Sequence, residues 1–96
     1  MKIQQVDERE YGFIQLLDGT SQKGKIEYKY EGPTVLVATH TEIDSEHRGE
    51  GLGEKLVDFL MDFVKLKNLQ LKSECPYASR IIQKNPDYRD LLKADQ

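Results

Sequence analysis

The segment Glu46-His47-Arg48-Gly49-Glu50-Gly51-Leu52-Gly53-Glu54-Lys55-Leu56 is the most informative part of the chain, and its glycines stand at alternate positions. Glycine accepts positive φ and allows another group to approach the backbone closely. A turn of this kind before a helix leaves the first N–H groups of the helix free, at the positive end of its dipole, where an anion binds. The segment predicts either a diphosphate-binding turn or a connection whose glycines only make the turn.

The sequence changes its period across this segment. After it, apolar residues recur at steps of 4, 3, 4 and 3, which predicts an amphipathic helix over 53–68 with Asn68 near its C-cap; they are Leu52, Leu56, Phe59, Phe63 and Leu66. Before it, 34–43 is the longest predicted strand. Its start, 35–38, is uninterruptedly apolar, which is typical of a central strand covered on both faces.

The remaining elements follow from shorter patterns. Strands are predicted over 4–8, 13–17, 23–30 and 69–73, and helices over 77–84 and 87–93. The fifth strand follows a helix, so it should pair in parallel with the fourth through a right-handed crossover. The predicted class is therefore α+β, in the order β-β-β-β-α-β-α-α, with an antiparallel meander of four strands.

Composition restricts the function. With 96 residues the chain is expected to form a single domain over 1–96. It has 14 Lys and Arg against 17 Asp and Glu, and a net charge of −3, which argues against partners such as nucleic acid or a membrane surface. One cysteine and two histidines predict no disulfide and no metal site. The first residues lack the apolar stretch of a signal peptide, so a cytoplasmic location is expected.

Two other glycine-rich motifs do not fit the segment. A P-loop requires Gly-Lys-Ser/Thr, which the chain lacks. The dinucleotide fingerprint requires a third glycine where Glu54 stands, and it follows the first strand of its fold rather than a meander.

The run Arg48-Gly49-Glu50-Gly51-Leu52-Gly53 resembles motif A of the GCN5-related N-acetyltransferases, whose pattern is Gln/Arg-x-x-Gly-x-Gly/Ala. The resemblance extends over 34–88. Downstream, Cys75-Pro76-Tyr77 and Asn85-Pro86-Asp87-Tyr88 look like a subgroup of very small, single-domain, bacterial-type members. The resemblance implies a truncated form of this fold and an acetyl-CoA-dependent N-acetyltransferase.

The resemblance also implies where acetyl-CoA would bind. The pantetheine arm would pair with the strand at Glu42 and Ile43, and the thioester would lie near His40 and Cys75. The loop amides would bind the pyrophosphate, and they belong to Arg48, Gly49, Glu50, Gly51, Leu52 and Gly53.

Two departures from the family pattern bear on the acceptor and on the chemistry. Larger members have helices between their first two strands, whereas here only 8–12 joins them. The acceptor side should therefore be open, which suits a protein amine or a small amine such as a polyamine. The tyrosine that many members use as general acid falls at Ile82, and Cys75 stands where the family often has asparagine.

The chemistry leaves several alternatives open. For direct transfer, His40 or Glu42 is the candidate base, because an imidazole ordinarily takes up a proton near neutral pH. In a covalent route, Cys75 is the nucleophile and His40 takes its proton. Cys75 and His40 could equally be a buried small residue and a hydrogen-bonded polar one. The alternative function is a non-catalytic acyl-CoA-binding module, and an open sheet edge would also allow a homodimer.

Overall fold

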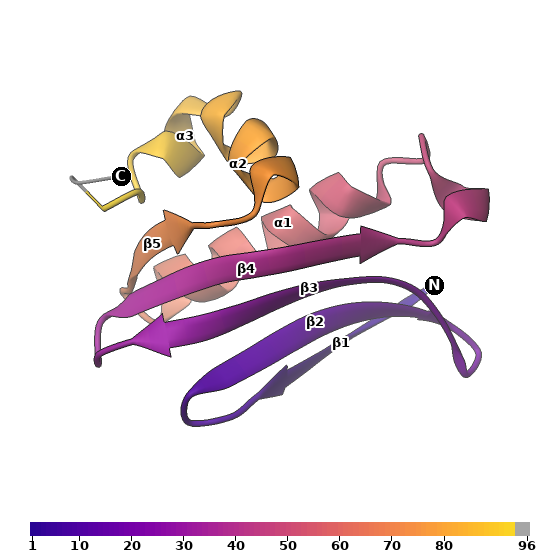
Figure 1. Cartoon of the computed structure of the whole chain (residues 1–96), viewed down its shortest axis with the longest axis horizontal. Helices are drawn as coiled ribbons and strands as arrows, with labels where there is room; N and C mark the ends of the chain where they lie inside the picture. Colours follow the sequence, from indigo (N-terminus) through magenta and orange to yellow (C-terminus); the bar gives the residue numbers. More distant parts are fainter. Residues whose placement is uncertain (94–96) are drawn as a thin grey trace.

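The computed structural model describes residues 1–93, which form one five-stranded sheet in the order β1-β2-β3-β4-β5 (Figure 1). β1 to β4 are antiparallel neighbours, and β5 pairs in parallel with β4. The predicted α+β class and strand order are confirmed. The strands span β1 Lys2–Asp7, β2 Tyr11–Asp18, β3 Ser21–Glu31, β4 Val35–Ile43 and β5 Gln70–Ser73.

The helices follow β4 and β5. A short 3-10 turn, η1 (Ser45–His47), precedes α1 (Leu52–Leu66), and α2 (Pro76–Gln83) and α3 (Pro86–Arg89) follow β5. α1 ends at Leu66 with Lys67 as its C-cap, and Asn68 follows in the left-handed conformation, φ 56°, a position where Asn and Gly are favoured.

The predicted helix over 87–93 is wrong in its second half. α3 ends at Arg89, and the chain then runs beside β5, where Leu71 N–H donates to the Leu91 carbonyl over 2.9 Å and Lys93 N–H to the Leu71 carbonyl over 2.8 Å. The outer edge of β5 offers backbone groups that need partners, so pairing there competes successfully with another helical turn.

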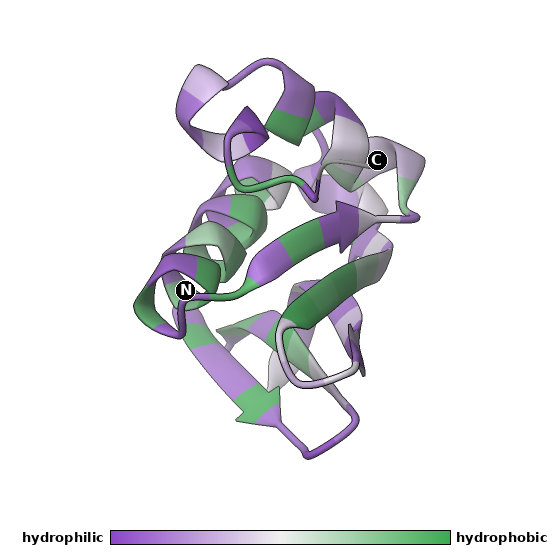
Figure 2. Ribbon diagram, turned by 90° about the vertical axis from the view of Figure 1, so that its left-hand side faces the viewer, coloured by the Kyte–Doolittle hydropathy of each residue, from purple (hydrophilic) through white to green (hydrophobic). Residues whose placement is uncertain are grey.

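The hydrophobic core lies between the sheet and the helices. Leu56, Leu60 and Val64 of α1 are fully buried against the strands, among them Ile14 and Ile26. Hydrophobic positions recur along α1 and along the strands beside it (Figure 2). Ala78 and Ile82 of α2 belong to the same cluster, so α1 and α2 cover the same face of the sheet.

The apolar start of β4 is buried on both faces of a central strand, as its sequence predicts, although no helix within 1–93 packs on the face opposite α1. On that face Val35 and Val37 are 6% and 0% exposed. Two ion pairs cross β4 over these valines. In the first, Lys72 Nζ of β5 lies 2.8 Å from a Glu31 carboxylate oxygen of β3. The second pair joins Lys29 Nζ to a Glu74 carboxylate oxygen over 3.5 Å. The aliphatic stems of long charged side chains cover apolar surface in this way.

A bulge in β4 decides which of its side chains face this open side. Glu27 of β3 pairs with His40 and the next residue, Tyr28, pairs with Ala38, so Thr39 is the extra residue. Its hydroxyl donates to the Glu27 carbonyl over 3.2 Å. The extra residue reverses the alternation of faces. Beyond the bulge, Thr41 therefore lies on the same helix-covered side as Ala38, whereas His40 projects to the open side.

Tyr28 gives a test of how β1 is held to the sheet. Its side chain is 2% exposed, and its hydroxyl donates to Asp7 over 2.6 Å and accepts from Gln5 over 2.9 Å. Tyr28→Phe should lower the free energy of unfolding by about 1–2 kcal/mol, because a partly buried carboxylate and amide each lose a partner. Urea denaturation measures this. Tyr11→Phe, 59% exposed, should change stability by less than about 0.5 kcal/mol; equal losses would contradict the account.

Candidate functional site

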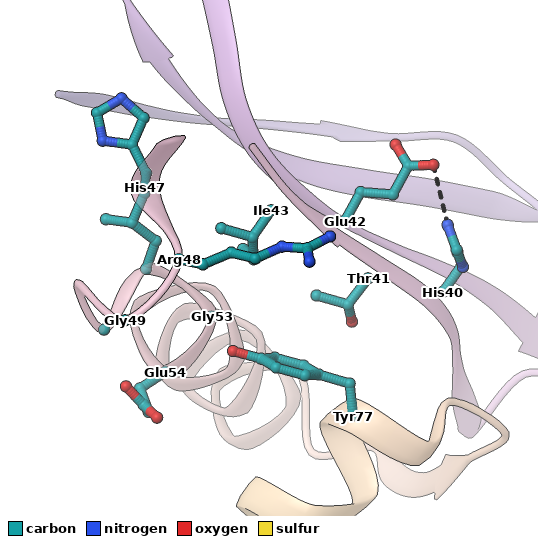
Figure 3. A pocket seen from close by; sticks show the side chains of 12 residues that line it. His40, Thr41, Glu42, Ile43, His47, Arg48, Gly49, Gly53, Glu54 and Tyr77 are labelled. Atoms are coloured by element: carbon teal, nitrogen blue, oxygen red, sulfur yellow. Dashed lines mark hydrogen bonds and ion pairs between the residues drawn. The ribbon is translucent and has the colours of Figure 1, made fainter. Parts of the chain in front are cut away.

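A groove of about 660 Å³ lies where the second half of β4 passes the N-terminus of α1 (Figure 3). β4 and β5 pair only from Val35–Gln70 to Ala38–Ser73. After Ala38 the two strands part, so the remainder of β4 is paired with β3 alone among the described residues. The groove is lined by His40, Thr41, Glu42, Ile43, His47, Arg48, Gly49, Gly51, Leu52, Gly53, Glu54 and Tyr77.

The lining contains every residue expected at the pyrophosphate and the pantetheine arm except Glu50. The Glu50 carboxylate instead lies 3.1 Å from Nδ1 of His47. This contact holds the Glu50 carboxylate beside the imidazole, outside the lining of the groove.

The first turn of α1 has no side-chain cap. Its N-cap is Gly51, with φ 78°, and Gly49 also has positive φ, 85°. The N–H groups of the first turn of a helix have no partner within the helix. Because no side chain caps them here, this end of α1 can accept an anion from solution.

Asp44 anchors the loop between β4 and α1. Its carboxylate accepts the Glu46 N–H over 3.0 Å, and its own N–H donates to the Lys23 carbonyl over 2.9 Å. The hydrogen bond from Glu46 lowers the pKa of the Asp44 carboxyl below its usual value. The loop that approaches α1 is thus held to β3.

His40 and Glu42 form a pair on the open face of the sheet. His40 Nε2 lies 3.0 Å from a Glu42 carboxylate oxygen, and the side chains are 54% and 58% exposed. The hydrogen bond from His40 lowers the pKa of Glu42. The contact with the Glu42 carboxylate fixes the orientation of the His40 ring.

Cys75 is placed differently from His40. Its side chain is 5% exposed, and Sγ lies 3.4 Å from the Thr41 hydroxyl. In Figure 3, Thr41 points from β4 toward Tyr77, whereas His40 and Glu42 project away. The predicted contact between Cys75 and His40 is therefore absent from residues 1–93, because the bulge at Thr39 turns Thr41 instead of His40 toward the face on which the helices pack.

Sequence reasoning missed Tyr77 as a groove residue. The hydroxyl end of its ring packs against Gly53, where a Cβ would overlap it. Burial raises the pKa of Tyr77, and the charge of Glu54 raises it further. A glycine inside a helix costs stability, so Gly53 was a signal that some group approaches this turn closely. The spacing gave no indication of which group it was.

Two negative observations concern the described residues. Within 1–93, no three His, Cys, Asp or Glu side chains are grouped so that they could hold a metal ion. No helix in this part of the chain is long and apolar enough to cross a membrane.

The sequence model of the GCN5-related N-acetyl-transferase family matches residues 12–91, and the chain belongs to this family. Membership supports acyl-CoA-dependent N-acetyl transfer as the general class of activity. The mixed sheet with β4 and β5 parallel is the fold of this family.

Relatives and solved structures agree with this assignment. Protein NATD1 of Bos taurus and that of Homo sapiens are each 29% identical over 80 residues, which covers 83% of this chain and 71% of theirs. A GCN5-like protein from Staphylococcus aureus superposes with a TM-score of 0.72 at 22% identity, covering 96% of this chain and 87% of that one.

An aminoglycoside N-acetyltransferase, AAC(6′)-Iy in complex with CoA, superposes with a TM-score of 0.64 at 11% identity, covering 96% of this chain and 90% of that one. At these identities the likeness of the solved structures concerns the fold.

Asp44 gives a pH-dependent test of the loop. The pKa of Asp44 is lowered in the folded state. The carboxylate therefore stabilises the fold at pH values above its unfolded-state pKa of about 3.9, and this contribution is lost as the pH falls through its folded-state pKa. The stability difference between wild type and Asp44→Ala should therefore shrink between about pH 5 and pH 3. Chemical denaturation at each pH measures it.

The matched control for this test is Glu10→Ala. The Glu10 side chain is exposed and forms no hydrogen bond or ion pair within residues 1–93, so the effect of this substitution on stability should be smaller across the same pH range. A difference for Asp44→Ala that grows toward acid pH would contradict the assigned hydrogen bond.

Proposed function

We propose that this chain binds acetyl-CoA along the groove and transfers the acetyl group to an amine. One observation carries the proposal: two features line the same groove. They are the edge of β4 that no longer pairs with β5, and the N-terminus of α1, which has no side-chain cap. The first offers backbone groups to an extended chain, and the second offers N–H donors to a diphosphate.

The residues of the groove suit the two parts of this ligand. The diphosphate would take the N–H groups around Gly51 and Gly53, with Arg48 beside them as a cation. The pantetheine arm would lie along the β4 edge at Glu42 and Ile43. When bound, acetyl-CoA would supply an acyl group activated as a thioester.

Direct transfer requires one new bond and one broken bond. The amine nitrogen bonds to the carbonyl carbon while the carbon–sulfur bond breaks, and the sulfur leaves with the electron pair. The amine loses a proton, and the leaving thiolate gains one from the site or from solvent. The protein must therefore supply a base on the side from which the amine approaches.

His40 is the proposed base, and Glu42 is the residue that orients it. The pair projects from β4 at the groove, on the face of the sheet that no helix within 1–93 covers. An amine on a protein surface, or a small polyamine, can reach this face without passing through an enclosed pocket. A neutral imidazole takes the proton of the amine, and the ionised carboxylate stabilises the imidazolium that forms.

The covalent route through Cys75 has less support. The thiol is buried beside Thr41 and does not line the groove. A nucleophilic cysteine needs its thiolate and therefore a base within reach. His40 on the opposite face does not provide that base.

One observation favours the second candidate function, a non-catalytic acyl-CoA-binding module. Ile82, which occupies the position of the tyrosine acid in many family members, is 1% exposed and part of the core. Such a module would bind acetyl-CoA and transfer nothing. An acceptor screen distinguishes the two functions, because acetylation of any amine beyond the uncatalysed rate requires the enzyme.

Gly51 tests the proposed binding site. Gly51→Ala forces a side chain into φ 78° at a strain of about 1–2 kcal/mol. We expect acetyl-CoA affinity to fall by about ten-fold or more, because the first turn of α1 leaves the geometry that aims its N–H groups. Isothermal titration calorimetry measures the affinity.

Gly32→Ala is the matched control for Gly51. Gly32 has nearly the same φ, 73°, and lies in the turn between β3 and β4, so it should lose similar stability and keep full affinity. Equal affinity in the two variants would sink the proposed diphosphate site.

His40 tests the proposed chemistry. His40→Ala should lower the rate of acetyl transfer by about 10²–10⁴-fold, the range for a general base, with little change in acetyl-CoA affinity. Cys75→Ser should keep most of the rate, and intact-mass analysis should find no acetyl group on the wild-type protein. An acetylated Cys75, or an unchanged rate for His40→Ala, would show that direct transfer with His40 as base is incorrect.

A further inference from the structure

Tyr77 extends across the groove and joins the N-terminal turns of two helices. It follows Pro76 at the start of α2, and the hydroxyl end of its ring packs against Gly53 in the first turn of α1 (Figure 3). A Cβ at residue 53 would overlap the hydroxyl oxygen and two ring carbons of Tyr77. Glycine at this position therefore admits the ring into the groove.

The hydroxyl of Tyr77 differs from those of three other tyrosines. Tyr28, Tyr30 and Tyr88 each donate to an aspartate. Within residues 1–93 the Tyr77 hydroxyl forms no hydrogen bond. Burial raises its pKa, so the group keeps its proton at neutral pH and remains a donor.

The ring of Tyr77 also has a definite place relative to β4. Thr41 and Ile43 line the groove together with Tyr77, and Figure 3 shows Thr41 pointing toward the ring. The ring thus forms a flat wall that faces the edge of β4. The space between the wall and the edge suits an unbranched chain.

We propose that Tyr77 is a binding and positioning residue for the ligand of this groove. Its hydroxyl donates a hydrogen bond to the diphosphate at the first turn of α1, and its ring holds the pantetheine arm against β4. The inference rests on the proposed function, because it concerns the same ligand. By fixing the path of the arm, the ring also fixes where the thioester stops relative to His40.

The two roles predict different losses for two ligands. Adenosine 3′-phosphate 5′-diphosphate carries the diphosphate and lacks pantetheine. Tyr77→Phe removes only the hydroxyl, so it should weaken this compound and acetyl-CoA by the same factor, about five- to twenty-fold. Tyr77→Ala also removes the wall, so it should weaken acetyl-CoA further and leave the affinity of the diphosphate compound at the level of Tyr77→Phe.

Calorimetric titration of wild type, Tyr77→Phe and Tyr77→Ala with both compounds is the first experiment. Tyr11→Phe is the matched control, because Tyr11 is 59% exposed and does not line the groove; it should bind as wild type does. Circular dichroism establishes that each variant is folded.

A double-mutant cycle separates the ring contact from a general effect on the helix. Gly53→Ala should weaken acetyl-CoA binding in the wild-type background, because the new methyl group displaces the Tyr77 ring. In the Tyr77→Ala background the same change should cost several-fold less. Equal losses in the two backgrounds would show that residue 53 acts on binding without Tyr77.

The outcomes distinguish this inference from the proposed function. If wild type binds acetyl-CoA and Tyr77→Phe binds both compounds equally well, the inference is overturned and the proposed function stands. If Tyr77→Phe loses affinity for acetyl-CoA alone, the hydroxyl does not contact the diphosphate and the inference is again overturned. If wild type binds neither compound, the proposed function fails, and the inference fails with it.

Discussion

The separation of β4 from β5 after Ala38 and Ser73 is the constraint on which the rest of the site depends. A strand in the middle of a sheet satisfies its backbone groups on both sides, and β4 does so only over its first half. The chain leaves β5 after Ser73 and enters α2 through Pro76, which has no N–H to continue a ladder. The backbone at the second half of β4 therefore faces a groove, and α1 begins at the end of that groove.

The bulge at Thr39 then divides the chemistry between the two sides of β4. Thr41 and Ile43 stay on the side of the helices, where they line the groove beside Tyr77. His40 and Glu42 turn to the face that no helix covers among the described residues. In the proposed function, the ligand contacts and the base thus come from one strand, and the acceptor would approach from the open face. One extra residue in the strand produces this division.

Local patterns in the sequence predict much of this fold. These patterns are the apolar start of β4, the three- and four-residue spacing in α1 and the glycines between them, and each involves residues close together in the sequence. The structure has β4, the loop and α1 in the expected order. The lining of the groove by Arg48, Gly49 and Gly51 follows from that order.

Contacts between distant segments were not predictable in the same way. The pairing of Leu91 and Lys93 with Leu71 stops α3 early, and the ion pairs that cover Val35 and Val37 join β3 to β5 and the turn after it. The bulge at Thr39 reverses the faces of the residues after it, so counting along the strand could not settle the relation of His40 to Cys75. Tyr77 meets Gly53 only after the crossover brings α2 beside α1.

The central claim is that one ligand occupies both the N-terminus of α1 and the edge of β4. A titration of the isotope-labelled protein with acetyl-CoA, followed through its backbone amide resonances, tests this most directly. The account predicts that the largest shifts fall in residues 41–43, 48–54 and 77, with little change in β1 and β2. Shifts confined to other parts of the sheet, or none at saturating acetyl-CoA, would contradict it.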